Sequence, residues 1–466
     1  MAITAGGIGS GLDIESLVTQ LVAAEGQPTS FRLDRKEASF QADLSAYGTL
    51  KAALSTFQTS VKALNDPESF QGRSATSSDT DLFTVSADTT AVAGSYDIEV
   101  TQLAEAAKLR SGDFTSGTEV VGTGTLDITL GSDTFQIVVD TDNQTLEGIR
   151  DAINAASDNP GVTASIINVD DGLGGSVSRL ILSSDKIGAA NDISIAVTDD
   201  DLDNADTSGL SQLATANLTS LQAAQDAIIF VDQQQVTRGD NTFSDVITGV
   251  SFTLKKADIG TTETLAIALD KASVKSKVTG FVESYNSLVE TMNTLASYSS
   301  EGGASGPLVG DSVLRGVKSQ IRQQMTSAIS GLEFSTLSEI GVTTDDTGKL
   351  KLDSSKFDEV LTSDFTAVSQ LFASENGLAN SLSGILEGYI DSSGILSART
   401  EGLQNRIGSI SDDRERLGLR LDALEKRYRA QFTAMDILVA QLQSTGNFLT
   451  SQLANLPKPN SIRSNN

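Results

Sequence analysis

Both ends of this chain carry a helical heptad pattern, and the middle of the chain does not. Apolar residues that recur alternately four and three positions apart lie on one narrow face of an α-helix, the pattern of a helix that packs along a partner helix. Three such stripes occur, two near the ends and one directly after the middle segment. They consist of Phe40, Leu44, Tyr47, Lys51, Leu54, Phe57, Val61 and Leu64; of Val274, Val278, Phe281, Tyr285, Leu288, Met292 and Leu295; and of Leu403, Ile407, Ile410, Arg414, Leu417, Leu421, Leu424, Tyr428, Gln431, Met435, Leu438, Leu442, Thr445 and Leu449.

Stripes this narrow cannot be buried within a single helix, so each helix must lie against another one. The simplest arrangement brings the two chain ends together as a hairpin, with the middle segment inserted at its far end. Spacing alone does not decide whether the partner helices belong to the same chain. Phe432, Ile437 and Val439 add a second apolar face beside the last stripe, which favours contact with another chain. The residues predicted to bind partner proteins are Leu17, Leu21, Phe432, Leu438, Leu442 and Leu449.

Capping residues and helix breakers predict where the terminal helices begin and end. Asp13 is a typical N-cap, and the helix after it is predicted to end near Gly26 and Pro28, because proline removes a backbone hydrogen bond. A second helix is predicted over 29–64, and the last helix from about Leu396 to just before Pro457.

The middle segment is predicted to form antiparallel β-structure. Tyr96, Ile98 and Val100 alternate with acidic residues, the mark of a half-buried strand, and further short strand-like runs follow between 126 and 269. One helix, predicted over 146–156, interrupts them. Because helices do not alternate regularly with strands, the pattern favours an antiparallel sheet over a parallel wound sheet.

The sequence thus predicts a multidomain α+β protein: an elongated hairpin with coiled-coil-like N- and C-terminal helices, a helical leg domain and two inserted antiparallel β-rich head domains. Because the strand pattern closes within the insert, residues 95–271 are expected to fold as an independent unit. The predicted parts are a terminal helical leg-end region (1–42 with 432–466), the leg domain (43–94 with 272–431), a first head domain (95–110 with 214–271) and a second head domain (111–213).

The residue types that the chain lacks exclude most enzymatic chemistry. Cys, His and Trp are all absent from the 466 residues, which removes thiolate and imidazole metal ligands, thiol nucleophiles and imidazole acid–base catalysis. The absence of disulfides fits a reducing compartment and equally fits a protein that is exported unfolded, so the compartment stays open. We predict that the protein is not an enzyme and holds no catalytic, cofactor-binding or metal-binding residues.

The net charge of −28 argues against a nucleic-acid partner, because phosphate binding requires clustered Lys and Arg. No apolar run approaches the roughly 18 residues of a membrane span, so no insertion into a membrane is expected. The first residues, MAITAGGIGSGLDIESL, lack a basic start and an apolar signal-peptide core, which predicts that any export occurs without a cleaved signal peptide.

The acidic residues allow two other interpretations. The acidic run Asp199, Asp200, Asp201, Asp203 and Asp206 suggests calcium binding, because carboxylates at alternate positions can surround a hard cation, but it fails the template of a calcium-binding loop. The sixth position is Asn204 instead of Gly, and the twelfth is Leu210 instead of Glu, so a solvated acidic loop is expected. Paired carboxylates could in principle hydrolyse glycosides, but the scarcity of aromatic residues removes the platforms on which sugars stack.

Six segments of the chain resemble one known family, the bacterial flagellar filament cap protein, also called flagellar hook-associated protein two. The resemblance extends in order over nearly the whole chain. The segments are GIGSGLDIESLV (7–18), SAYGTLKAALSTFQ (45–58), TLEGIRDAIN (145–154), GPLVGDSVLR (306–315), IGVTTDDTGKLKLD (340–353) and a closing helix that contains YRAQFTAMDILVAQLQSTGNFLTSQL.

The resemblance implies a non-enzymatic assembly factor outside the cell, exported through the flagellar secretion channel to the tip of the filament. It implies a homo-oligomeric ring that promotes folding and insertion of exported flagellin and prevents its leakage. Further partners implied by the resemblance are hook-associated junction proteins, the flagellar export apparatus and a chaperone. The paired terminal helices would engage the filament, and the β-rich insert would form a head plate.

A second function class remains open on the sequence alone. An extracellular adhesin or a tail-fibre-like binding subunit could also combine a helical stalk with a β-rich head that mediates cell adhesion. An adhesin should carry a concave or aromatic-rich tip, which this sequence does not indicate.

Overall fold

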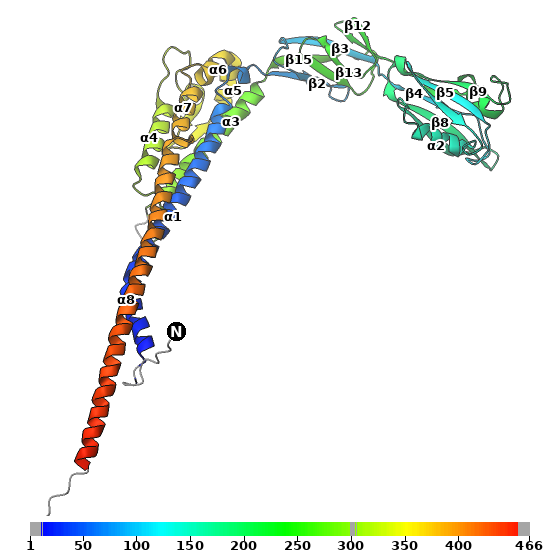
Figure 1. Cartoon of the computed structure of the whole chain (residues 1–466). Helices are drawn as coiled ribbons and strands as arrows, with labels where there is room; N and C mark the ends of the chain where they lie inside the picture. Colours follow the sequence, from blue (N-terminus) through cyan, green and yellow to red (C-terminus); the bar gives the residue numbers. More distant parts are fainter. Residues whose placement is uncertain (1–10, 12, 299–302, 304, 455–466) are drawn as a thin grey trace, which may run out of the picture. The chain divides into compact units, whose positions relative to one another are not determined.

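The computed structural model describes residues 11, 13–298, 303 and 305–454, which form two compact units (Figure 1). One unit combines the two ends of the chain, up to Ser69 and from Val274 onward, and the other consists of Phe70–Ser273. The first unit is mainly helical, and the second contains antiparallel sheets. The predicted α+β class, with a long C-terminal helix and inserted β-rich segments, is therefore confirmed.

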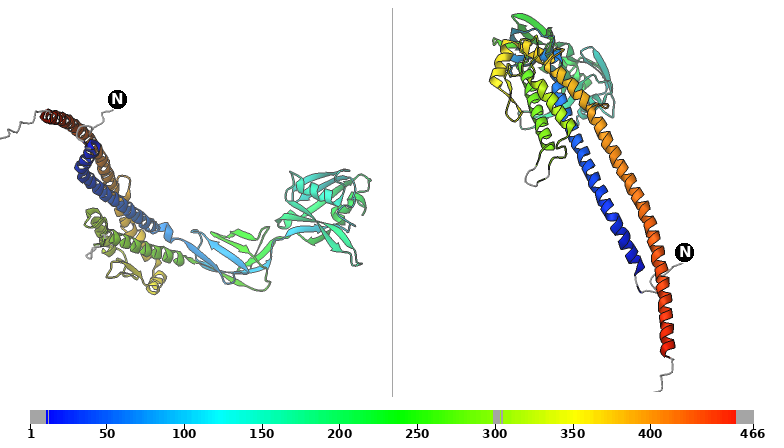
Figure 2. Two further views of the ribbon diagram at one scale, coloured as in Figure 1. Left: turned by 90° about the horizontal axis from the view of Figure 1, so that it is seen from below. Right: turned by 90° about the vertical axis from the view of Figure 1, so that its left-hand side faces the viewer.

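The helical unit contains two long helices, a bundle of shorter helices and one small hairpin. Its elements are α1 (Ile14–Lys62), α3 (Lys271–Leu295), α4 (Ser312–Thr326), β16 (Val342–Thr344), β17 (Leu350–Leu352), α5 (Ser354–Ser363), α6 (Phe365–Ala373), α7 (Leu378–Ile390) and α8 (Ile395–Ala454). The helices α1 and α8 lie side by side in both Figure 1 and the right-hand view of Figure 2.

The helix α1 runs without interruption through Pro28, so the predicted end near Gly26 and the predicted restart at Thr29 are wrong. Proline removes one backbone hydrogen bond, but packing on α8 maintains the helix on both sides of it. Glu25 pairs with Arg420 at 3.1 Å, and Gly26 lies so close to Leu421 that a Cβ atom there would be 2.7 Å from the leucine Cδ1. Contacts with the partner helix therefore outweigh the local cost of the proline.

Aromatic rings fill the core of the helical bundle. Phe57 of α1 contacts Phe281 and Tyr285 of α3, with ring centroids 5.5 and 5.8 Å apart, and Phe281 contacts Phe372 of α6 at 6.0 Å. Leu288, one turn further along α3, is also buried. The stripe predicted on α3 is thus the core-facing side of that helix.

A buried tyrosine connects three of the helices. The Tyr47 hydroxyl donates to the Asp311 carboxylate at 2.6 Å, and the Arg399 guanidinium donates to the same hydroxyl oxygen at 3.2 Å. Asp311 also caps α4 by accepting from the backbone N–H groups of Val313 and Leu314. Burial, together with the hydrogen bond to Asp311, raises the pKa of Tyr47 to about 12, so the hydroxyl keeps its proton at physiological pH.

The second unit consists of antiparallel sheets and one helix. Its elements are β1 (Arg73–Ser77), β2 (Phe83–Ala87), β3 (Gly94–Gln102), β4 (Ala106–Arg110), β5 (Gly124–Leu130), β6 (Asp133–Val139), α2 (Leu146–Ala155), β7 (Val162–Asp170), β8 (Ser176–Ile187), β9 (Ile193–Asp199), β10 (Thr219–Gln222), β11 (Ala227–Val231), β12 (Gln234–Arg238), β13 (Thr242–Ile247), β14 (Val250–Leu254) and β15 (Glu263–Leu269).

The strands of the second unit surround two separate hydrophobic cores. The first core lies between the sheet β1-β15-β3-β11-β12 and the sheet β13-β14-β2. The second core lies among the sheet β10-β4-β8-β7, the sheet β6-β5-β9 and α2. The sequence pattern assigns residues 70–94 to the helical leg domain, but in the structure they supply β1 and β2 to the sheets around the first core. The strand β4 lies within the segment predicted for the first head domain (95–110), but it packs in the second core.

The sequence suggested that the acidic loop after β9 is fully solvated, but the structure buries one of its aspartates. Asp199 is buried, and its carboxylate accepts hydrogen bonds from the backbone N–H and the hydroxyl of Ser211, at 2.9 and 3.2 Å. This aspartate therefore closes the loop onto the short helical turn Gly209–Leu213. Asp200, Asp201 and Asp203 are exposed, as expected.

The pairing of β1 and β2 changes the boundary at which the insert should fold alone. A fragment of residues 70–273 is expected to melt cooperatively and to give dispersed amide spectra, because it contains every strand of both cores. A fragment of 95–271 is expected to melt at least 10 °C lower or not to fold, because removing Phe83, which is fully buried, typically costs about 3–5 kcal/mol. Circular dichroism melts of the two fragments test this, and equal melting temperatures would show that β1 and β2 are dispensable.

Candidate interaction surface

Ion pairs between α1 and α8 fix the register of the two helices. Every acidic partner lies on α1 and every basic partner on α8 in this set, which is formed by Glu15 with Arg429, Glu25 with Arg420, and Asp34 and Glu37 with Arg414. The residue numbers rise on one helix as they fall on the other, so the helices are antiparallel. The hydrogen bond with Glu15 raises the pKa of Arg429, and the hydrogen bond with Asp34 raises that of Arg414.

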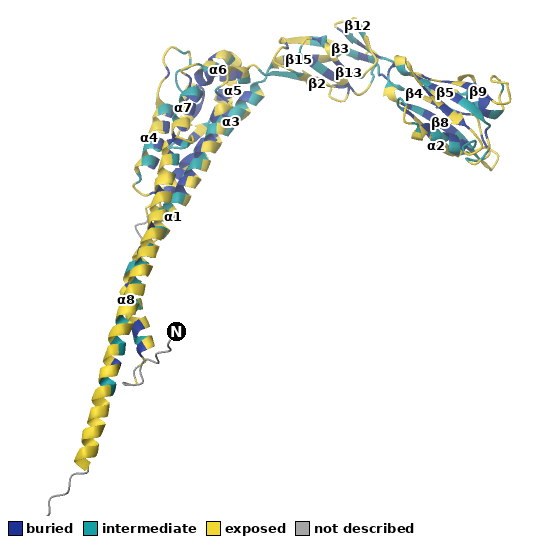
Figure 3. Ribbon diagram, in the orientation of Figure 1, coloured by how far each residue is buried: buried dark blue, intermediate teal, exposed yellow. Residues whose placement is uncertain are grey.

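The register leaves the last part of α8 without a partner from α1. Glu15 lies in the first turn of α1 and already pairs with Arg429, whereas α8 continues to Ala454. The segment 431–454 contains a single charged residue, Asp436. Figure 3 shows that this part of α8 is exposed over most of its length. A nearly uncharged helix with an exposed apolar surface is typical of a protein-binding segment.

The structure places four of the six predicted binding residues on exposed surface. Leu438, Leu442 and Leu449 are 56%, 64% and 54% exposed, and their spacing of four and seven puts them on one face of α8. Leu21 on α1 is also exposed. Leu17 and Phe432 are half-buried, close to the level where the α1–α8 pair ends. We call Leu438, Leu442 and Leu449 the α8 stripe.

Further exposed apolar residues lie on the same segment of α8. Met435 and Leu453 extend the α8 stripe at its two ends, and Ile437 and Phe448 lie on an adjacent face. Phe448 was not singled out from the sequence. Its spacing of eleven residues from Ile437, close to three helical turns, is the signal that could have identified it.

The described residues give little support to a small-molecule or metal site. No group of three or more His, Cys, Asp or Glu side chains within them could hold a metal ion. Among the helices that the structure describes, none is both long enough and apolar enough to cross a membrane. One hollow of the helical unit, about 400 Å³, lies between α3, α4 and the β16–β17 turn, and its lining includes Lys318, Arg322 and Asp346.

Comparison with known protein families gives three matches along the chain. The model described as "Flagellar hook-associated protein 2 N-terminus" matches residues 10–107, and the one described as "Flagellar hook-associated protein 2 C-terminus" matches residues 224–444. The model described as "Flagellin hook IN motif" matches residues 125–186. The first two together include the terminal helices, the helical bundle and part of the inserted unit.

Individual relatives match over nearly their full length. The chain is 36% identical to the A-type flagellar hook-associated protein 2 of Pseudomonas aeruginosa over 470 residues, which cover 97% of this chain and 98% of the relative. It is 34% identical to the flagellar hook-associated protein 2 of Escherichia coli K12, with the same coverage. The crystal structure of the D1-D2-D3 domains of the flagellar cap protein FliD from Escherichia coli is similar, with a TM-score of 0.58, 33% identity, and coverage of 77% of this chain and 99% of that chain.

Proposed function

Because the chain belongs to the flagellar hook-associated protein 2 family and therefore caps the flagellar filament, we propose that the α8 stripe is the surface with which it engages that filament. The observation that carries this proposal is the exposure of Leu438, Leu442 and Leu449 on a helix segment with one charged residue. Burying a leucine side chain contributes roughly 1.5–3 kcal/mol, so three of them supply a strong drive for docking.

The proposed partners follow from this role. The chain forms a homo-oligomeric ring at the distal end of the filament, where it contacts flagellin, promotes the folding and insertion of new flagellin subunits and prevents their leakage. Hook-associated junction proteins, the export apparatus and a chaperone would meet the chain before it reaches the tip. Export through the flagellar secretion channel, without a cleaved signal peptide, is part of the same proposal.

The parts of the chain would divide this work between them. Residues 1–42 with 432–466 would form the leg end that enters the filament, although 1–10, 12 and 455–466 lie outside the described residues. The helical bundle would hold neighbouring copies together, and the two β-rich cores would form the head plate. The apolar stripe at the end of α8 is exposed and so free to contact the filament, whereas the apolar stripe of α3 is buried inside the helical bundle, which supports this division.

The alternative of an adhesin or tail-fibre-like subunit is not favoured, because the relatives that match over their full length are flagellar hook-associated proteins. The family is structural, and the described residues carry no recognisable catalytic arrangement.

Restoring filaments in a flagellated cell that lacks its own cap protein tests the proposed function. The full chain is expected to restore filament growth and swimming and to lower the amount of flagellin in the medium by about tenfold or more, because a capped end retains the exported subunits. Gold-labelled antibody against the chain should mark filament tips in electron micrographs. Label spread along the filament, or on the cell surface without restored growth, would instead favour the adhesin.

A further inference from the structure

Two outward stripes on the helical bundle carry opposite charges at the same spacing. On α3, positions 283, 287, 290 and 294 read Glu, Ser, Glu and Thr, and all four are exposed. On α4, positions 315, 319, 322 and 326 read Arg, Ser, Arg and Thr, and all four are exposed as well. Both sets follow the spacing i, i+4, i+7, i+11, which places each set on one helical face. We call them the acidic α3 stripe and the basic α4 stripe.

The basic α4 stripe is an exception in this acidic chain. The helix α4 contains Arg315, Lys318 and Arg322 and no acidic residue, whereas the chain has a net charge of −28. Among the described residues, none of these three side chains forms an ion pair with a carboxylate, although Arg399, Arg414, Arg416, Arg420 and Arg429 of α8 all do so. These three cations therefore stay available for carboxylates of another chain, although Asp345 and Asp346 line the same hollow as Lys318 and Arg322.

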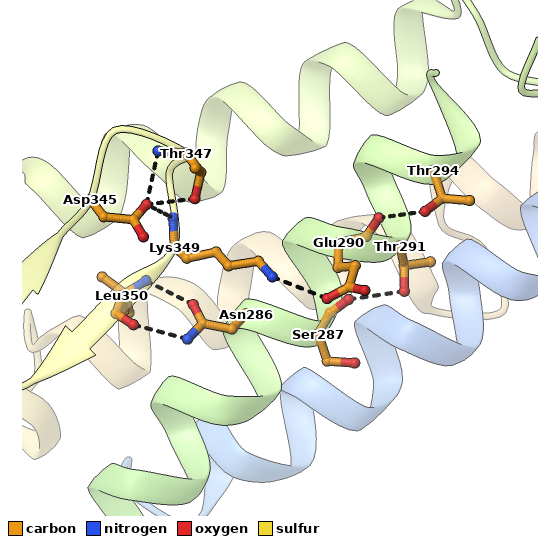
Figure 4. A network of polar contacts seen from close by, with 9 residues as sticks. All are labelled: Asn286, Ser287, Glu290, Thr291, Thr294, Asp345, Thr347, Lys349 and Leu350. Carbon is orange, nitrogen blue, oxygen red and sulfur yellow. Dashed lines mark hydrogen bonds and ion pairs between the residues drawn. The ribbon is translucent and has the colours of Figure 1, made fainter. Parts of the chain in front are cut away.

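The acidic α3 stripe borders a shallow, open hollow on the surface between α3 and α1. Thr49 of α1 and Ser287, Glu290, Thr291 and Thr294 of α3 line this hollow, whose volume is about 340 Å³. Figure 4 shows these α3 side chains beside α1, with the Lys349 ammonium 3.1 Å from the Glu290 carboxylate. The Glu290 side chain remains 70% exposed despite this ion pair, so its carboxylate is still accessible to a second cation. Apart from Glu290 and Leu295, the side chains that line the hollow are Ser and Thr, whose small size allows close approach of a helix.

The acidic α3 stripe faces away from α4 within one copy. Tyr285, Val289 and Met292 of α3 face α4 across the larger hollow described above. At 3.6 residues per turn, they lie about half a turn around α3 from Ser287, the centre of the acidic stripe. On α4, Arg322 of the basic stripe lines the same larger hollow, and Arg315 and Ser319 lie further around the helix from the buried residues Val317 and Ile321. A contact between the two stripes must therefore join different copies of the chain.

We propose that α4 of one copy docks in the α3–α1 hollow of the next copy, with Arg315 facing Glu290 and Arg322 facing Glu283. This inference rests on the proposed function, because it specifies the contact that holds the ring together. Lys318 contacts Asn293 while Arg322 lies beside Tyr285, so α3 and α4 are antiparallel within one copy. A rotation about an axis parallel to these helices does not reverse their direction, so α4 of one copy would also be antiparallel to α3 of the next copy. In that arrangement Ser319 would face Ser287, between the two ion pairs.

Such a contact is heterologous, since each copy offers one surface to its left-hand neighbour and a different surface to its right-hand neighbour. Contacts of this kind generate a closed ring when the rotation closes. Exposed ion pairs across the contact also make assembly sensitive to ionic strength, so association should weaken as salt rises from about 0.05 to 0.5 M.

Charge reversal on the full chain tests the contact. One variant carries Arg315→Glu and Arg322→Glu, and a second carries Glu283→Arg and Glu290→Arg. Each is expected to raise the concentration needed for self-assembly about tenfold or more in sedimentation velocity at low salt, because like charges then face each other. An equimolar mixture of the two variants, and a chain carrying all four substitutions, are expected to assemble again, because opposite charges are restored.

A matched control separates the position of the charges from their number. The variant Arg32→Glu with Arg35→Glu changes the net charge by the same amount on the exposed surface of α1 and is expected to assemble as the unmodified chain does. Thermal melts of all variants should agree within a few degrees, since the substituted side chains are exposed. Unchanged assembly of the Arg315/Arg322 variant, or equal loss in the control, would overturn the proposed contact. An unmodified chain that stays monomeric would instead contradict the proposed ring itself.

Discussion

The substitution Leu288→Asp is expected to abolish cooperative folding of the helical unit. Leu288 is 1% exposed and lies on the core-facing stripe of α3. A carboxylate at this position would be buried with no cationic partner, and it would also remove the packing of the leucine side chain, which alone is worth about 2–5 kcal/mol. Because a folded domain is stabilised by only about 5–15 kcal/mol, the combined loss is comparable to the whole stability of the unit.

Circular dichroism melts can follow this loss separately in the two units. The helical signal of the Leu288→Asp chain should disappear at a much lower temperature, while the β-rich unit of Phe70–Ser273 should keep its own transition because it contains complete cores. Leu442→Asp is the matched control, since it introduces the same group at a leucine that is 64% exposed and should leave both transitions within a few degrees. A Leu288→Asp chain that melts as the unmodified chain does would show that this face of α3 is accessible to solvent.

Periodicity predicted the helical unit well because its main contacts run between long helices. The heptad stripes located the buried side of α3 and of the inner part of α1, and the buried residues Leu54, Phe57 and Val278 all belong to those stripes. The break near Pro28 was predicted wrongly, because the contacts that maintain the helix there come from α8, nearly 400 residues further along the chain. Local sequence does not contain that information.

The strands β1 and β2 were missed for a similar reason. The sequence of β1, RSATS, is mostly polar, and that of β2, FTVSA, alternates apolar and polar residues but is only five residues long. They become strands because β15 and β14 supply their hydrogen-bonding partners from the far end of the insert, as in the pairing of Arg73 with Leu269 and of Phe83 with Leu254. Strand propensity depends strongly on such cross-strand neighbours.

The candidate interaction surfaces were partly visible in the sequence. The α8 stripe could be predicted because Leu438, Leu442 and Leu449 continue the heptad pattern beyond the point where α1 has residues to oppose it. The charged stripes of α3 and α4 could have been found by noting that Glu283 and Arg315 lie on the side away from the apolar residues of each helix. Their use in one contact depends on the hollow between α3 and α1, which only the fold reveals.

Replacing the α8 stripe by Leu438→Asp, Leu442→Asp and Leu449→Asp together is expected to abolish filament growth without unfolding the chain. The three leucines contribute roughly 5–9 kcal/mol if they are buried completely on docking, and three carboxylates in an apolar contact oppose docking further. Because all three side chains are more than half exposed in the chain by itself, its melting temperature should change by only a few degrees. Complementation of a cell that lacks its own cap protein, with flagellin measured in the medium, gives the readout.

The opposite face of the same segment provides the control for charge. Ser444→Asp, Asn447→Asp and Ser451→Asp add the same three carboxylates to α8 at exposed polar positions away from the α8 stripe. If the apolar face engages the filament, this variant should still support filament growth, whereas the leucine variant should release flagellin into the medium although it remains folded and exported. Equal growth with both variants would mean that the α8 stripe is not needed for capping. Equal loss with both would indicate that this part of α8 is enclosed on all sides, so that an added charge on any face prevents docking.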